Sequence, residues 1–238
     1  MGKILNIETS TRICSVALAI DGQVAAMQES SVENSHARHI TVFAEEVMYL
    51  AGMNFKDLDA VAVSKGPGSY TGLRIGVSTA KGFCYSLDKP LISVGTLRSL
   101  ANGMIEKMKS EGKDPNEYLF CPMIDARRME VYTAVYDSTL HELLPVKAEV
   151  IDEGSFAEFF QGEKPLVFIG DGAPKCKDIL ATVSGKALFP GDFPASAAYM
   201  ARLSEEKFRQ GQFEDTAYFE PFYLKDFVAG IPRVKGLR

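Results

Sequence analysis

The chain has 238 residues, of which 46% are hydrophobic and 24% charged, with a formal net charge of −5. This composition is that of a globular protein large enough for one large domain or two small ones. No apolar run reaches the roughly 18 residues of a membrane helix. The acidic balance disfavours a protein that holds RNA by a basic face of its own. An early Glu8 argues against a signal peptide, and four widely spaced cysteines predict free thiols in a cytoplasmic protein.

The first half of the chain predicts three strands followed by alternating helices and strands. The turn Asp21-Gly22, between the second and third strands, is typical of a hairpin. Two segments with helical spacing flank a short buried strand, which ends at Gly66-Pro67-Gly68. The expected strands are residues 4–8, 14–20, 23–30, 59–64 and 90–94, and the expected helices are residues 35–51 and 71–87.

The second half repeats much of this order. Its expected strands are residues 118–124, 131–136, 144–150 and 166–169, and its expected helices are residues 155–161, 173–181 and 194–210. Two copies of one order predict a duplicated α/β fold, with parallel strands covered by helices. The polar run between Glu106 and Glu117 suggests a division into residues 1–105 and 106–238. We expect the last helix and the tail to pack back on the first part.

The segment between the buried strand and the second helix is rich in glycine and hydroxyl residues. Glycine lets a backbone approach a ligand closely, and the free N–H groups of a helix N-terminus attract anions. The segment lacks the Lys-Ser/Thr ending of a Walker loop. The alternative is a tight turn with Ser69 or Thr71 as the helix N-cap. The candidate phosphate- or nucleotide-binding residues are Gly66, Pro67, Gly68, Ser69 and Thr71.

Glu8, Thr9 and Ser10 follow the first strand and form a second candidate. A carboxylate at a strand end, followed by hydroxyls, can hold a metal or face a phosphate. The alternative, which we favour, is that these residues shape the turn into the next strand. All three are grouped with the phosphate candidates as part of a vestigial site.

Neither a metal site nor a catalytic group is predicted elsewhere. His36 and His39 are three residues apart, whereas the histidines of zinc helices are four apart, so a polar helix start is the simpler interpretation. Asp125 and Arg127 lie between two strands and are candidates to pair and fix a turn. No nucleophile elbow or catalytic triad is evident. We therefore expect no cofactor and no catalytic residue.

Each of the two helices in the first half has an apolar core stripe and a second, mixed stripe beside it. Small residues in such a stripe let another helix approach closely, and interfaces favour aromatic residues mixed with selected polar groups. The alternative is that the second stripes pack internally. The candidate interface residues are His39, Val42, Glu46 and Tyr49 on the first helix and Gly72, Gly76, Thr79 and Phe83 on the second.

Several blocks of the sequence resemble the TsaB/TsaD family. They are Ile-Glu-Thr-Ser at residues 7–10, Lys-Gly-Pro-Gly-Ser-Tyr-Thr-Gly-Leu-Arg-Ile-Gly at 65–76 and Ala-Lys-Gly at 80–82. The segments at 125–132 and 220–224 look like the TsaB branch in particular. The resemblance implies a duplicated actin/hexokinase/Hsp70-like (RNase H-like) fold, with two mixed sheets flanked by helices.

The resemblance also implies a function. The TsaD transferase carries a metal-binding His-x-x-x-His motif where this sequence reads Gly95-Thr96-Leu97-Arg98-Ser99-Leu100, so both histidines are missing. The expected role is therefore a non-catalytic subunit, an inactive paralogue that supports TsaD and recruits the ATPase TsaE. That complex transfers threonylcarbamoyl onto the adenosine beside the tRNA anticodon, and tRNA is contacted through the complex. We expect a homodimer in isolation. The alternative is a free-standing ATPase, kinase or metal-dependent hydrolase of the same fold.

Overall fold

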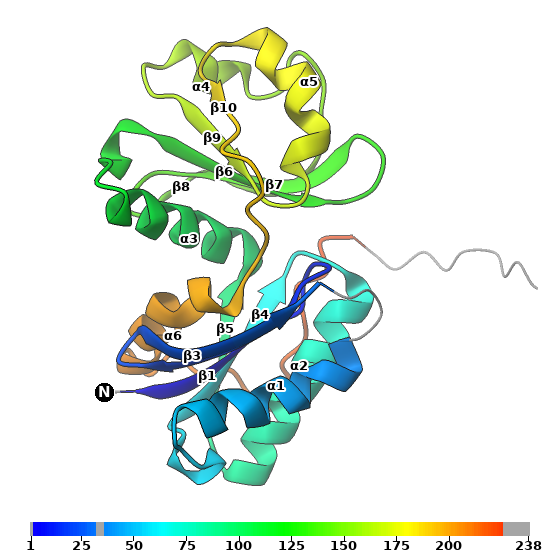
Figure 1. Cartoon of the computed structure of the whole chain (residues 1–238). Coiled ribbons are helices and arrows are strands. Elements are labelled where there is room, and N and C mark those ends of the chain that lie inside the picture. Colours follow the sequence, from blue (N-terminus) through cyan, green and yellow to red (C-terminus); the bar gives the residue numbers. More distant parts are fainter. Residues whose placement is uncertain (1, 32–35, 226–238) are drawn as a thin grey trace, which may run out of the picture.

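The structure, a computed structural model, describes residues 2–31 and 36–225, without the side chains of residues 36–38. Within this part, no helix is both long enough and apolar enough to span a bilayer. Two five-stranded mixed sheets lie one above the other, each flanked by helices (Figure 1). This arrangement confirms the predicted fold class.

The first sheet has the strand order β3-β2-β1-β4-β5. Its strands are β1 (Lys3–Glu8), β2 (Cys14–Ile20), β3 (Gln23–Ser30), β4 (Ala60–Gly66) and β5 (Leu91–Gly95). β1 pairs antiparallel with β2 and parallel with β4, and β4 pairs parallel with β5. Helices α1 (His36–Leu50) and α2 (Tyr70–Leu87) cover one face, with the short η1 (Phe55–Asp57) between α1 and β4. All seven elements predicted for this half are present, with bounds that differ by at most two residues.

The second sheet repeats this plan with the order β10-β9-β6-β7-β8. Its strands are β6 (Leu119–Asp125), β7 (Glu130–Tyr136), β8 (Glu142–Val150), β9 (Leu166–Ile169) and the short β10 (Ala187–Leu188), with helices α4 (Ala157–Gln161) and α5 (Ala173–Val183). β6 pairs antiparallel with β7 and parallel with β9, as β1 does with β2 and β4. The duplicated order inferred from the sequence is therefore present in the fold.

Helix α3 (Thr96–Ser110) lies between the two sheets and was not predicted (Figure 1). Its Leu97, Leu100 and Met104 share one core with Ile4 of the first sheet and Phe120 of the second. Successive strand residues point to opposite faces of the sheet. Leu5, which follows Ile4 in β1, therefore packs in the other core, under α1 and α2. The predicted division after residue 105 falls inside α3; the domain division itself stays a prediction. The short η2 (Pro115–Glu117) follows α3.

The expected helix at residues 194–210 is shorter than predicted. It consists of η3 (Ala197–Met200) and α6 (Ala201–Arg209). Ser196 caps η3, because its hydroxyl accepts a hydrogen bond from Ala198 N at 3.3 Å. Both η3 and α6 contact strands of the first sheet, so the chain returns from the second half to the first.

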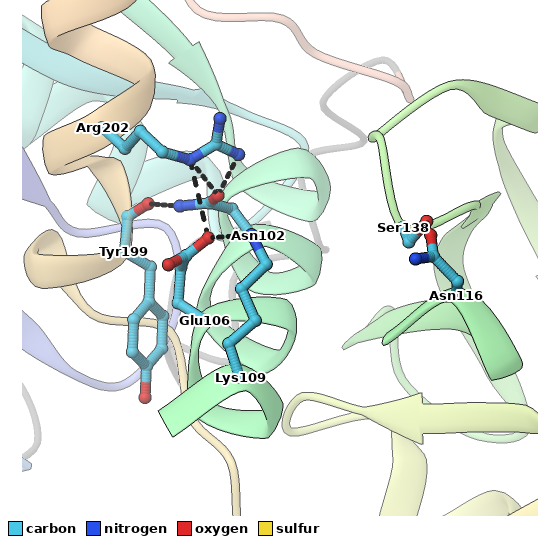
Figure 2. Close-up of polar contacts among 7 residues, drawn as sticks. All are labelled: Asn102, Glu106, Lys109, Asn116, Ser138, Tyr199 and Arg202. Carbon is cyan, nitrogen blue, oxygen red and sulfur yellow. Dashed lines mark hydrogen bonds and ion pairs between the residues drawn. The ribbon is translucent and has the colours of Figure 1, made fainter. Parts of the chain in front are cut away.

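A polar network fixes this returning segment to α3 (Figure 2). Asn102 Nδ2 donates to the Tyr199 carbonyl at 2.8 Å, while Asn102 Oδ1 accepts a bond from Arg202 Nε at 3.0 Å. Arg202 also lies 3.8 Å from a carboxylate oxygen of Glu106. The Tyr199 ring packs so closely on Gly103 that a Cβ there would overlap it. The central helix is therefore tied to elements of both halves.

Candidate functional site

The residues singled out at the end of β1 lie at the carboxyl edge of the first sheet, against the N-terminus of α2. Glu8 is fully buried. Its Oε1 accepts hydrogen bonds from Ser10 N at 2.6 Å and from the Ser64 hydroxyl at 2.8 Å, whereas Oε2 has no hydrogen-bond partner within the described part of the chain. The carboxyl group thus ties the turn after β1 to neighbouring β4.

The glycines of α2 bring this turn and the helix together. A Cβ on Gly72 would overlap the Thr9 carbonyl oxygen, and one on Gly76 would overlap the Thr9 hydroxyl. The Thr9 hydroxyl donates to the Gly72 carbonyl at 2.8 Å. One turn earlier, a Cβ on Gly68 would overlap the Ser10 carbonyl oxygen. Glycine is required at Gly68 and Gly72 because backbone oxygens occupy the space, and at Gly76 because the Thr9 hydroxyl does.

The same contacts use the donors that an anion would need. Ser69 N donates to the Ser10 carbonyl at 2.7 Å, and the Ser69 hydroxyl caps α2 by accepting from Gly72 N at 3.2 Å. Gly66 and Pro67 are buried beside the C-terminal segment, where Phe222 N donates to the Lys65 carbonyl at 2.7 Å. Thr71 is exposed. The structure therefore brings most of the phosphate candidates together. It also explains the glycines by packing, in agreement with the alternative interpretation of this segment as a tight turn before a capped helix. Phosphate binding stays a prediction.

The close contact of Thr9 with α2 has a measurable consequence. We expect Gly72→Ala to lower the free energy of unfolding by about 1–3 kcal/mol, because the added methyl meets a backbone oxygen that cannot move aside. Gly82 lies in the same helix, with nothing within 4 Å of the position that an added methyl group would take. There the same substitution should stabilise the chain by roughly 0.5–1 kcal/mol, since alanine favours helix. Urea denaturation of both variants checks the opposite signs; equal effects would contradict the packing.

Burial also sets the ionisation of Glu8. Removal from water raises the pKa of this carboxyl above its ordinary value of 4.5, while the hydrogen bonds from Ser10 and Ser64 oppose the shift. The folded chain therefore keeps the Glu8 proton to a higher pH than the unfolded chain does. As pH rises above about 4.5, the unfolded chain loses this proton first, which favours unfolding.

Glu8→Gln tests this linkage. The amide oxygen can accept the bonds from Ser10 and Ser64, yet the side chain does not titrate. We expect the variant to lose less stability than the wild type as pH rises from 5 to 8, because only the wild type carries a carboxyl group at position 8 whose pKa is raised on folding. Urea denaturation across this range gives the comparison. Parallel stability curves would show that Glu8 has the same pKa in both states.

The cysteines and the remaining polar candidates have structural surroundings. All four cysteines are free and buried, and burial raises the pKa of the Cys14, Cys84 and Cys176 thiols to about 11, so they stay neutral. Asp125 Oδ1 accepts from Arg127 N at 2.7 Å and from Lys175 Nζ at 2.5 Å.

The turn is therefore fixed through the Arg127 backbone and a lysine, rather than through an arginine side chain. Among the described residues, no three His, Cys, Asp or Glu side chains gather as a metal group. The side chain of His36 lies outside the described residues.

The predicted interface stripes are only partly exposed. On α1, Val42 is 45% and Tyr49 85% exposed, while His39 and Glu46 are half-buried and the His39 ring stacks on Phe43. On α2 the prediction that Gly72 and Gly76 lie on an outward stripe is wrong, because both are buried against Thr9.

Thr79 and Phe83 of α2 are half-buried. The Thr79 hydroxyl donates to the Ile75 carbonyl at 2.9 Å, and the Phe83 ring stacks on Phe55 with centroids 5.3 Å apart. The sequence reasoning missed two exposed apolar side chains on these helices, Leu50 at 61% and Tyr85 at 90%. Ser78 and Tyr85 are seven residues apart and therefore lie on the same face of α2. A helical wheel that marks the exposed face, rather than the small residues, identifies Tyr85.

Comparison with known proteins agrees with the topology. A family model described as TsaD, tRNA N6-adenosine threonylcarbamoyltransferase, matches residues 28–232. The tRNA threonylcarbamoyladenosine biosynthesis protein TsaB of Escherichia coli (strain K12) is 32% identical over 235 residues, which cover 95% of this chain and 96% of the relative. The chain belongs to the TsaB family. The TsaB protein of Bacillus subtilis (strain 168) is 29% identical over 228 residues, or 93% of each chain.

A solved structure supports the fold independently. The crystal structure of an uncharacterized protein with similarity to peptidase YEAZ from Pseudomonas aeruginosa superposes with a TM-score of 0.79 at 22% identity. The match covers 94% of this chain and 100% of that one. The two structures therefore share one fold over almost their whole length.

Proposed function

We propose that this chain is a non-catalytic subunit in tRNA threonylcarbamoyladenosine biosynthesis, which binds and supports the transferase TsaD. Relatives that span nearly the whole chain are named for this biosynthesis, and the matching family model is that of the transferase itself. The observation that carries the non-catalytic role is the packing of Thr9 and Ser10 against the glycines of α2. In a ligand-binding loop the space beside these glycines would be open to the ligand. In this chain the residues after β1 occupy it.

The sequence after β5 supports the same role. Thr96, Leu97 and Ser99 are buried in the first turns of α3, in the segment that replaces the histidine motif expected of the transferase. They offer no ligand set for a transition metal, which prefers imidazole, thiolate or carboxylate groups. The alternative of a free-standing ATPase or metal-dependent hydrolase requires an open loop or a metal group, and neither observation favours it.

The partner surface that we propose is the outer side of α1 and α2. We define the helical face as Val42, Tyr49, Leu50 and Tyr85. All four are large apolar or aromatic side chains between 45% and 90% exposed on the two helices that cover one side of the first sheet. Exposed aromatic and large apolar residues are typical of protein interfaces.

The half-buried His39, Glu46, Thr79 and Phe83 remain candidates for the edge of this interface, whereas Gly72 and Gly76 do not. In our proposal the helical face pairs with the equivalent helices of TsaD to form a four-helix bundle. In the absence of TsaD, the same face pairs with a second copy about a two-fold axis, because an isologous contact needs only one self-complementary surface. TsaE is recruited to the complex, and tRNA is contacted through it.

Tyr49→Asp tests the helical face. A buried charge at an interface hot spot costs on the order of 2 kcal/mol or more, which corresponds to roughly 30-fold weaker binding. We expect the variant to lose capture of TsaD in a pull-down and to shift towards the monomer in light scattering. Because Tyr49 is 85% exposed in the isolated fold, circular dichroism should show an unchanged structure.

Val150→Asp is the matched control. Val150 is 64% exposed but lies at the end of β8 in the second sheet, away from α1 and α2. We expect it to bind TsaD as the wild type does. A folded Tyr49→Asp variant that still captures TsaD would place the interface elsewhere, and loss of binding by both variants would show a charge effect unrelated to the helical face.

A further inference from the structure

A cavity of about 510 Å³ lies between the two halves of the chain. The interface proposed above for TsaD does not include it. Its wall is formed by the end of β4, the start of α3, strands β7 and β8, helix α6 and the C-terminal segment at Phe222. Small-molecule sites in proteins commonly have volumes of roughly 300–1,000 Å³ and lie between domains or halves of a fold. The size and position of this cavity therefore match those of a ligand site.

Three cationic side chains, Lys65, Arg98 and Lys207, line the cavity. The Lys207 ammonium is partly buried and donates to the Ser93 carbonyl at 2.8 Å. Burial and the positive charges of Lys65 and Arg98 lower the pKa of Lys207, against the opposing effect of Glu214. Within the described residues, the Lys65 side chain has no hydrogen-bond or ion-pair partner. Arg98 Nη1 donates to the Leu140 carbonyl at 3.0 Å. Lys207 lies close enough to Lys65 and Arg98 to be repelled by both.

The N-terminus of α3 adds to this positive potential. Gly95 is the N-cap of this 15-residue helix and supplies no capping side chain. Gly95, Leu97 and Arg98 all line the cavity, so the first turn of the helix borders it. The first N–H groups of a helix have no partner within the helix, and the helix dipole favours an anion beside them.

The other side chains that line the cavity limit the net charge and the shape of a ligand that could bind there. Glu142 and Glu206 also line the cavity, and Glu142 accepts a hydrogen bond from the Tyr136 hydroxyl at 3.4 Å. The wall itself carries three cations and two carboxylates, and Glu214 acts on Lys207 from outside the wall, so the site suits one oxyanion group rather than a polyphosphate. Apolar surface comes from Val146, Leu203 and Phe222.

We propose that this cavity binds a small organic anion. Lys65, Arg98 and Lys207 hold its single oxyanion group, a phosphate monoester or a carboxylate, beside the N-terminus of α3. The apolar body of the ligand packs against Val146, Leu203 and Phe222. The site does not depend on the pairing of the helical face with TsaD, so each proposal can fail without the other.

Calorimetric titration of the full chain tests the site, with phenyl phosphate and benzoate as the two oxyanion probes and phenol as the neutral one. We expect one of the oxyanions to bind with a dissociation constant of roughly 1 mM or below, and phenol to bind much more weakly. Binding of phenyl phosphate alone identifies a phosphate ester as the natural group, and binding of benzoate alone identifies a carboxylate.

Three variants make the test specific. Lys65→Gln should weaken binding of the oxyanion about tenfold, because it removes a charged hydrogen-bond donor. Lys207→Gln is a second variant with the same expectation. Lys56→Gln removes the same charge from exposed η1, outside the cavity, and should bind as the wild type does. Circular dichroism confirms that each variant is folded.

Three results would overturn the proposal. The first is a wild-type chain that binds neither oxyanion at about 10 mM. The second is binding by folded Lys65→Gln and folded Lys207→Gln that is as strong as binding by the wild type. The third is an equal loss of binding in Lys56→Gln, which would show a general charge effect.

Discussion

The close approach of Thr9 to helix α2 determines how the first half of this protein is built. The helix can lie on the turn after β1 only because Gly72 and Gly76 leave room for the Thr9 carbonyl and hydroxyl. This contact holds α2 against the sheet, where Leu73, Val77 and Ala80 are buried. Glu8, the residue before Thr9, is fully buried. The opposite side of the helix, with Tyr85, is left facing outwards.

The same contact explains how a glycine-rich motif can be retained in a chain for which we propose no chemistry. In an open loop, glycines let a phosphate approach the backbone; here they let one part of the backbone approach another. The sheet edge and the helix N-terminus keep their places in the fold, but Ser10 and Ser69 bond to each other through their backbones. A scaffold of this kind needs the motif for packing even when no ligand binds.

Much of this fold could be predicted from the sequence, because the pattern of apolar residues and turn signals is clear in both sheets. Helix α3 was missed because polar residues such as Glu106 and Lys109 at its end suggested a linker, whereas its first turns are buried between the two sheets. Its buried Leu97, Leu100 and Met104 recur at helical spacing, so an apolar stripe does mark this helix in the sequence. The last helix was predicted too long because Ser196 begins a 3-10 turn before α6.

The candidate site shows a different limit of sequence reasoning. The spacing of Gly72 and Gly76 correctly indicated a close approach to α2, but it could not tell which partner approaches. The answer depends on Thr9, which is more than sixty positions earlier in the chain and meets the helix only through the pairing of β1 with β4. The exposed Tyr85 and Leu50 were missed for a related reason, since exposure is fixed by which sides of α1 and α2 the sheet covers.

The central claim, that this chain supports the modification of tRNA without catalysing it, is tested most directly by nucleoside mass spectrometry. The quantity to measure is threonylcarbamoyladenosine in tRNA from cells depleted of the protein, with the purified chain assayed alone in parallel. The account predicts a loss of the modified nucleoside after depletion and no formation of it by the isolated chain. Normal levels after full depletion, with no paralogue taking its place, would contradict the account, as would modification of tRNA by the chain alone.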